Sequence, residues 1–130
     1  MRSQSREIAL QILFQTEFAS QIQYSEFLEV FEQTIDQPIL DYADMLISGV
    51  KANQEKIDSL LGSTSNNWSI QRMALVDRNI LRLATYELKL MPEPLKPSIV
   101  INEAVELAKK YSTTESASFV NGILDQISKG

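Results

Sequence analysis

The sequence predicts an all-α fold, a compact single-domain helical bundle of about six or seven helices over residues 1–130. Three observations predict it. Only four glycines and four prolines interrupt the 130 residues. Between these breaks the apolar residues recur at steps of three and four, which places them on one face of a helix. A chain of this length also suits one domain with one core.

The first two helices are expected over residues 2–19 and 24–32. The earlier segment carries an apolar stripe too wide for a surface helix, so we predict that it is largely buried. The later segment is short, and Ser25 is placed to cap it. The inward-facing residues are Ile8, Ala9, Leu10, Ile12, Leu13, Phe14 and Phe18 in the first helix and Phe27, Leu28 and Phe31 in the second.

A long helix is predicted from Pro38 to about Leu61. Proline is favoured in the first turn of a helix, where a missing N–H is tolerated. Gly62 is well placed to end this helix. Its predicted core residues are Ile39, Ala43, Leu46, Val50 and Ile57.

The segment STSNNWSIQRM (residues 63–73) is a turn-rich connector that carries the only tryptophan, Trp68. A lone tryptophan after a loop commonly closes the end of a bundle. A helix follows over residues 76–90. Apolar residues nearly encircle it, so we predict that it is the central helix. The three prolines of MPEPLKP (residues 91–97) end it.

The next helix is expected to begin near Ser98, which is placed to cap it. Glu106 and Lys110 are predicted to form a surface ion pair one helical turn apart. The inner stripe of this helix is predicted to comprise Ile101, Ala104, Val105, Ala108 and Tyr111.

The stretch ASFVNGILDQI (residues 117–127) allows two interpretations. Asn121-Gly122 between apolar residues is the signature of a β-hairpin, but those apolar residues recur at helical steps. The STTE pattern from Ser112 to Glu115 favours a helix, because it has the form of a capping box. Gly122 inside that helix costs about 1 kcal/mol relative to alanine, so we expect another helix to approach closely there.

The composition excludes several classes of function. The chain has no cysteine and no histidine, which removes disulfides, thiolate chemistry, the commonest metal ligand and the commonest general base. We expect no catalytic activity, no cofactor and no metal. No apolar run is long enough to span a membrane and no secretory signal is visible, so the cytoplasm is expected. The net charge of -5 arises mainly from acids within residues 21–60.

Three segments resemble one family. DRNILRLATYEL (residues 77–88) and PSIVINEAVELAKKYSTTESASFVNGILD (residues 97–125) closely resemble the NusB family of bacterial transcription antitermination factors, and SREIALQILFQTEF (residues 5–18) resembles its first helix. The resemblance spans essentially the whole chain. It implies a compact helical protein that binds boxA RNA together with NusE, a small-subunit ribosomal protein that doubles as a transcription factor. With other Nus factors, such a pair modifies RNA polymerase so that ribosomal RNA operons are read through.

The resemblance also implies site residues. It places contacts to RNA or NusE at the N-terminus, at an aromatic residue of the first helix, and at the starts of the central and last helices. Arg72 joins the RNA candidates because it lies near Trp68. The candidates for RNA binding are Arg2, Arg6, Phe14, Arg72, Arg78 and Phe119, and those for partner binding are Asp77 and Glu115.

Two departures from the family pattern concern RNA. The family often begins with a run of arginines, whereas only Arg2 and Arg6 stand here. Because each cation at a phosphate strengthens binding, we expect this chain to bind RNA weakly alone and to depend on NusE. The first-helix aromatic is often tyrosine in the family; Phe14 can stack on a base but cannot donate a hydrogen bond.

Structural roles compete with these assignments. A pair of exposed arginines is commonly just solvated, and Phe14 and Phe119 both suit core packing. Arg82, on the nearly all-apolar central helix, is predicted to be a partly buried structural residue paired with an acid such as Glu103.

Two other functions stay open at this point. A NusB-like domain also forms the N-terminal part of some ribosomal RNA cytosine methyltransferases, although this sequence shows no glycine-rich cofactor loop and no catalytic cysteine. The chain could also self-associate as a homodimer, because some family members resemble dimers that cover the RNA-facing surface.

Overall fold

The computed structural model describes residues 2–19, 21–64 and 70–130, so the predicted role of Trp68 lies outside the described residues. The described residues form helices and no β-strand, which confirms the all-α prediction. The α-helices are α1 (Arg2–Phe18), α2 (Tyr24–Glu29), α3 (Gln37–Ala52), α4 (Gln54–Thr64), α5 (Leu75–Thr85), α6 (Pro97–Tyr111) and α7 (Thr114–Lys129). A 3-10 turn, η1 (Ile70–Arg72), precedes α5, and a π-helical turn, η2 (Tyr86–Leu90), follows it.

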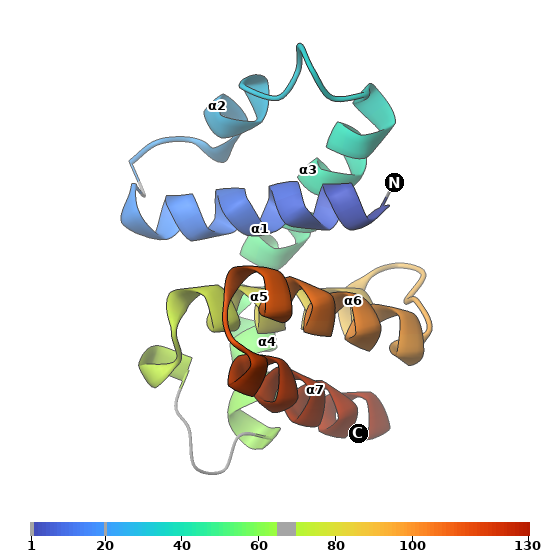
Figure 1. Ribbon diagram of the computed structural model, residues 1–130. Helices are drawn as coiled ribbons and strands as arrows, with labels where there is room; N and C mark the ends of the chain where they lie inside the picture. The colour runs from blue at the N-terminus through green and yellow to red at the C-terminus, as the bar shows by residue number, and fades with distance from the viewer. Residues whose placement is uncertain (1, 20, 65–69) are drawn as a thin grey trace.

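Helix α5 is the centre of the molecule (Figure 1). It contacts α1, α3, α4, α6 and α7. Its residues Ile80, Leu81 and Leu83 are each at most 1% exposed. A helix that is apolar on nearly every side is stable only when other helices surround it, and the predicted central position is confirmed. No described helix has both the length and the apolar character needed to span a bilayer.

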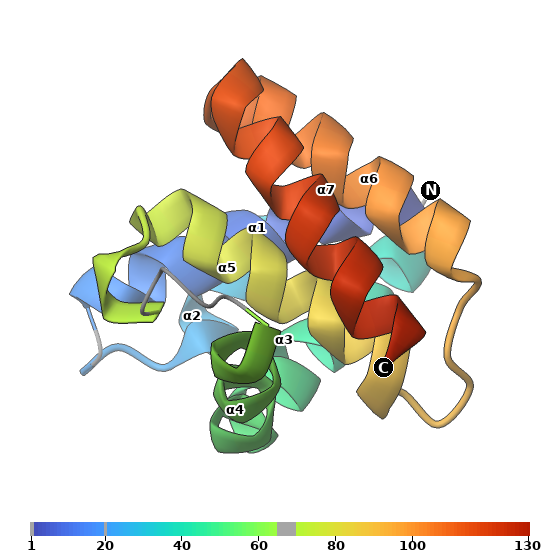
Figure 2. The ribbon, with the colours of Figure 1, turned by 90° about the horizontal axis from the view of Figure 1, so that it is seen from below.

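Helices α6 and α7 pack along each other over the face of α5 (Figure 2). The whole stretch from residue 117 to 127 is helical, which confirms the helical interpretation over the hairpin. The cap lies one residue later than predicted, because the backbone N–H of Ser116 donates to Oγ1 of Thr113 at 2.9 Å. With Thr113 as the N-cap, Glu115 is only the second residue of the helix. In a capping box the glutamate is the third residue of the helix, from which its side chain bonds to the backbone N–H of the N-cap. Glu115 is therefore not part of a capping box.

Two other predicted helix starts are corrected. Ser25 and Ser98 both lie inside their helices, and neither caps one. At α6 the reason is Pro97, whose fixed φ suits the first helical position, so that the cap is Lys96, two residues before Ser98. Helix α2 ends at Glu29 and not at Glu32. Its predicted inward residues do pack against the core: Phe27, Leu28 and Phe31.

The long helix predicted from Pro38 is divided into α3 and α4 at Asn53. The side-chain Nδ2 of Asn53 donates to the carbonyl oxygen of Gly49 at 2.8 Å. Such side-chain bonds to the backbone compete with helical ones, and Asn53 leaves the helical conformation with φ -116 and ψ 18. Gly62 does not end the second part, since α4 continues to Thr64.

The glycine at which helices approach closely is Gly49 and not Gly122. A Cβ atom at Gly122 would meet no other atom within 4 Å, so the predicted close approach there is wrong. A Cβ atom at Gly49 would lie 2.1 Å from Cζ of Tyr86. Only a hydrogen atom fits between α3 and the ring, and Gly49 therefore sets how closely α3 and η2 pack.

The predicted helix over residues 76–90 has the expected extent but changes type at its end. At η2 the N–H of Met91 donates to the carbonyl oxygen of Tyr86 at 3.1 Å, which spans five residues. A π-turn holds one residue more than an α-turn. Glu87 and Leu88 inside it stay buried, and Met91, before the prolines, is extended.

The buried side of α6 is rotated slightly from the predicted stripe, because this helix packs against both α5 and α7. Ile101 and Val105 are only partly buried. Glu106 pairs with Lys109, at 3.6 Å, and not with Lys110, which instead reaches Glu7 on α1. The buried residues of α6 are Val100, Ala104, Leu107 and Ala108.

Arg6 lies in a buried polar cluster between α1 and η2. It is 3% exposed, and its partner Glu87 is 1% exposed. Arg6 Nε donates to Oε1 of Glu87 at 2.8 Å and Nη2 donates to Oε2 at 2.9 Å, a bidentate pair. Tyr42 donates its hydroxyl to Glu87 Oε2 at 2.9 Å. The expectation that Arg6 faces solvent beside Arg2 is therefore wrong.

The electrostatics of this cluster follow from its burial. Desolvation opposes the charge of Arg6, but the hydrogen bond and the negative charge of Glu87 outweigh it and hold the pKa of Arg6 above its usual value. Burial, followed by the charge of Glu87 and the hydrogen bond to it, raises the pKa of Tyr42 to about 12. The cluster therefore favours one set of protonation states: charged Arg6 and neutral Tyr42.

Candidate functional site

Asp77, in the first turn of α5, has an incomplete set of hydrogen bonds. The residue is 8% exposed. Ser116 Oγ donates to Oδ2 at 2.8 Å, whereas Oδ1 is buried and accepts no hydrogen bond from any described residue. A buried acceptor without a donor costs about 1–3 kcal/mol. A ligand that supplied a donor at Oδ1 would recover that cost.

The start of α7 positions the single donor that Asp77 does have. Thr113 caps the helix by accepting from the N–H of Ser116. The hydroxyls of Ser112 and Thr113 each lie 3.0 Å from Ser116 Oγ, which in turn donates to Asp77. The hydroxyl-rich sequence STTES therefore fixes Ser116. Sequence reasoning interpreted this run only as a cap and missed its second role.

Four of the predicted site residues meet at one hollow of about 340 Å³ beside Asp77. Arg72 and Glu115 are exposed at it, and Phe119 is half-buried. The hollow thus combines a cation, two carboxylates and an aromatic ring. Its full lining is Arg72, Met73, Ala74, Asp77, Thr113, Glu115, Ser116 and Phe119.

A second hollow, of about 280 Å³, is also lined by the start of α5, at Val76, and contains Phe14. Phe14 is half-buried, and its ring meets that of Phe18 edge-to-face with 5.1 Å between centroids. Phe18 is 67% exposed, which sequence reasoning missed because the whole first helix appeared apolar. No charged residue lines this hollow, which comprises Leu10, Gln11, Phe14, Gln15, Val76 and Tyr111.

Arg78 and Arg82 are tied into ion pairs within the protein. Arg78 Nη2 donates to Glu17 at 2.6 Å. Arg82 donates to both oxygens of Asp58, at 2.9 and 3.0 Å, and to Glu17 at 3.2 Å. The predicted structural role of Arg82 is confirmed, but its partners are Asp58 and Glu17 and not Glu103. No spacing along the sequence indicates that Glu17 would join both arginines.

Arg2 lies apart from both hollows. Its guanidinium sits 4.9 Å from the centroid of the Tyr42 ring, at the N-terminal end of α1, opposite the end that carries Phe18 (Figure 1). Arg2 is exposed, so its charge is available to a ligand. The structure therefore brings Phe14, Arg72, Asp77, Glu115 and Phe119 to the two hollows and leaves Arg2 at a distance.

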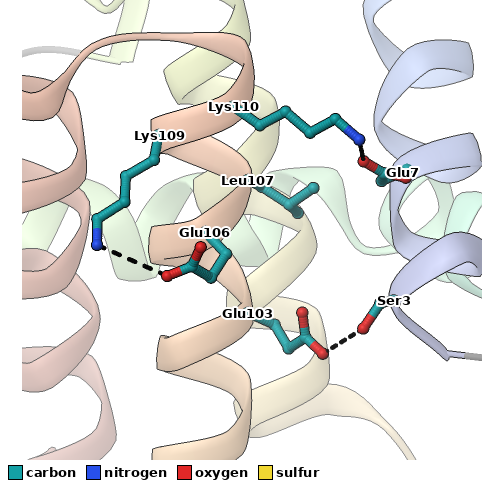
Figure 3. A pocket seen from close by; sticks show the side chains of 7 residues that line it. All are labelled: Ser3, Glu7, Glu103, Glu106, Leu107, Lys109 and Lys110. Carbon is teal, nitrogen blue, oxygen red and sulfur yellow. Dashed lines mark hydrogen bonds and ion pairs between the residues drawn. The ribbon is translucent and has the colours of Figure 1, made fainter.

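A third hollow, of about 370 Å³, separates α1 from α6 (Figure 3). Its acids are already paired. Glu7 accepts from Lys110, Glu103 from Ser3, and Glu106 lies near Lys109. These groups satisfy one another, and no set of three or more acidic residues in the described parts of the chain could hold a metal ion.

Comparisons with known proteins agree on one family. The sequence model of the NusB family matches residues 3–129. The transcription antitermination protein NusB of Bdellovibrio bacteriovorus is 58% identical over 128 residues, covering 98% of this chain and 95% of that protein. T. maritima NusB is 40% identical with a TM-score of 0.90, covering 99% of this chain and 91% of that chain. A crystal structure of antitermination factors NusB and NusE with dsRNA contains a chain 32% identical to this one, with a TM-score of 0.83 and coverage of 98% and 96%.

Proposed function

This chain belongs to the NusB family, and from that premise we propose that it is a non-enzymatic, RNA-binding transcription antitermination factor that pairs with NusE on boxA RNA. The pair would promote read-through of ribosomal RNA operons in the cytoplasm. Other Nus factors and RNA polymerase would be reached through the pair and not by this chain directly.

The observation that carries the proposal is the unpaired buried oxygen of Asp77. A free protein that keeps a buried carboxylate half-satisfied loses stability, and such a group is explained when a ligand completes it. Asp77 and the exposed Glu115 supply acceptors for donors of NusE. The neighbouring Arg72 and Phe119 supply a phosphate contact and a stacking surface for RNA.

The internal ion pairs of two arginines support dependence on NusE. Arg6 and Arg78 are held by Glu87 and Glu17, so the proposal leaves them out as phosphate contacts. Arg2 and Arg72 then remain among the predicted arginines. Each phosphate contact on a single strand contributes a salt-dependence slope of about 0.7, and two such contacts make for weak binding by this chain alone.

The identity of a relative bears on the alternative. The Bdellovibrio bacteriovorus protein that is 58% identical to this chain is a transcription antitermination protein. That identity supports this role over that of a domain in a ribosomal RNA cytosine methyltransferase.

The test is a titration of fluorescently labelled boxA RNA with this chain, with and without NusE, over a series of salt concentrations. We expect tight binding only with NusE, and weaker binding after Arg72→Ala or Phe119→Leu. Lys56→Ala, an exposed cation on α4, serves as the control. RNA that stays unbound at low salt in the presence of NusE would overturn the proposal. Light scattering of the same samples over a concentration series shows whether a homodimer forms.

A further inference from the structure

Two cations that no assignment above includes stand at the end of α6. Lys109 and Lys110 lie in its last turn, and their side chains are 54% and 61% exposed. Cations in the last turn of a helix are stabilised by its dipole, so both positions suit lysine. The cap of the next helix, Thr113, follows three residues after Lys110. Thr113 also lines the hollow that contains Phe119, so the chain runs from the two lysines to that hollow within a few residues.

We propose that Lys109 and Lys110 bind RNA phosphates and carry the strand from Arg2 to Phe119. This inference rests on the proposed function, since it extends the same RNA surface. The hollow between α1 and α6 has Ser3, next to Arg2, at one edge and the two lysines at another. Along the chain the lysines are followed by Tyr111, which lines the hollow at Phe14, and by Thr113, which lines the hollow at Phe119. A strand that touches both predicted ends of the surface thus crosses the lysines.

The partners of these lysines are exchangeable. Lys110 reaches across to Glu7 on α1, whereas Lys109 points away from α1 and lies near Glu106 (Figure 3). Ion pairs between exposed side chains are weak because water and salt screen them. A phosphate backbone offers many negative charges in a row and releases its counterions when it is bound. Binding of RNA can therefore replace both carboxylates.

A change at Glu7 distinguishes specific binding of RNA by Lys110 from a general attraction between the protein and RNA. In the free protein its carboxylate accepts from Lys110, and the hydroxyl of Tyr111 donates to it at 3.1 Å. A strand that takes Lys110 must displace that carboxylate. Removing the negative charge of Glu7 should then raise RNA affinity, although no contact to RNA is added.

The test uses the chain with NusE and labelled boxA RNA over a salt series. Lys109→Ala with Lys110→Ala should lower the magnitude of the salt slope by about 1.4, because two single-strand phosphate contacts are lost. Lys56→Ala with Lys129→Ala removes the same charge from exposed positions on α4 and α7 and should leave the slope unchanged. Glu7→Gln should strengthen binding at low salt. Thermal unfolding of each variant confirms that it is folded.

The outcomes separate the two proposals. If the unmodified pair does not bind RNA, the proposed function fails. If it binds but the variant at residues 109 and 110 behaves like its charge-matched control, this inference is overturned and the proposed function stands. Association with NusE is measured separately without RNA by calorimetry. A loss there would assign the lysines to the protein interface and would equally overturn the inference.

Discussion

Two buried carboxylates in this molecule have opposite surroundings. Glu87 accepts three hydrogen bonds from Arg6 and a fourth from Tyr42. Asp77 accepts one from Ser116 and keeps Oδ1 without a donor in the described structure. Both residues are less than a tenth exposed: 1% and 8%. Burial alone therefore does not distinguish the two carboxylates, whereas the number of hydrogen bonds that each accepts does.

The largest expected effect is on stability at Glu87. Glu87→Ala leaves the Arg6 guanidinium buried without its main partner, so the free energy of unfolding should fall by about 3–5 kcal/mol. Urea denaturation followed by circular dichroism measures it. A double change, Arg6→Met with Glu87→Leu, should restore much of the loss because it removes both charges. If Glu87→Ala alone were as stable as the unmodified protein, the cluster would not contribute to the stability of the fold.

Packing beside that cluster gives the next largest effect. Gly49→Ala places a methyl group against the Tyr86 ring, where the Cβ atom would lie 2.1 Å from Cζ. Overpacking of this kind costs about 1–3 kcal/mol. Gly122→Ala is the matched control, because its Cβ atom meets nothing within 4 Å and alanine favours a helix by about 1 kcal/mol. The two changes should shift the melting temperature in opposite directions.

The stability of the cluster should depend on pH in the alkaline range. The pKa of Tyr42 is raised from 10.0 to about 12 in the folded protein. The folded state thus holds its proton more tightly than the unfolded state. The stability that this adds is complete below pH 10 and is lost as the pH rises through 12. Unfolding free energies measured from pH 9 to 12 should fall less steeply for Tyr42→Phe than for the parent.

The smallest effect on stability is expected at Asp77. Asp77→Ala loses one hydrogen bond from Ser116 but also removes the unpaired oxygen, so the free energy of unfolding should change by less than about 1 kcal/mol. Binding of NusE should weaken at least about tenfold, which corresponds to 1.4 kcal/mol. Calorimetry with purified NusE measures it. If Asp77→Ala destabilised the fold as strongly as Glu87→Ala, the contrast between the two carboxylates would be lost.

Features that depend on the local periodicity of apolar residues were predicted well from the sequence. The repeat of apolar residues at helical steps located the helices, the central position of α5 and the helical character of residues 117–127. Helix ends were less predictable, because they depend on one or two bonds. The side chain of Asn53 divided a predicted helix, and Thr113 in place of Ser112 moved a cap by one residue.

Ion pairs between residues far apart in the sequence could not be predicted from local sequence patterns. Arg6 and Glu87 are 81 residues apart, and no spacing rule connects them. The same holds for Glu17 with Arg78 and Arg82. Five of the eight predicted site residues do gather around the start of α5, at the two hollows that contain Phe14 and Phe119; seven of the eight are implied by the family resemblance, and Arg72 is the other. Which of the arginines is free for a ligand depends on these long-range ion pairs.

The π-turn at the end of α5 makes this helix sensitive to a change in chain length. It accommodates one residue more than an α-turn would, within the span that ends at Met91. Deleting a single residue between 86 and 90 would convert it to regular α-helix and rotate the following residue by about 100° around the axis. Met91, now buried, would turn away from the core. A one-residue gap in this segment of a related sequence would therefore signal a repacked core, whereas the same gap in the loop before α6 would not.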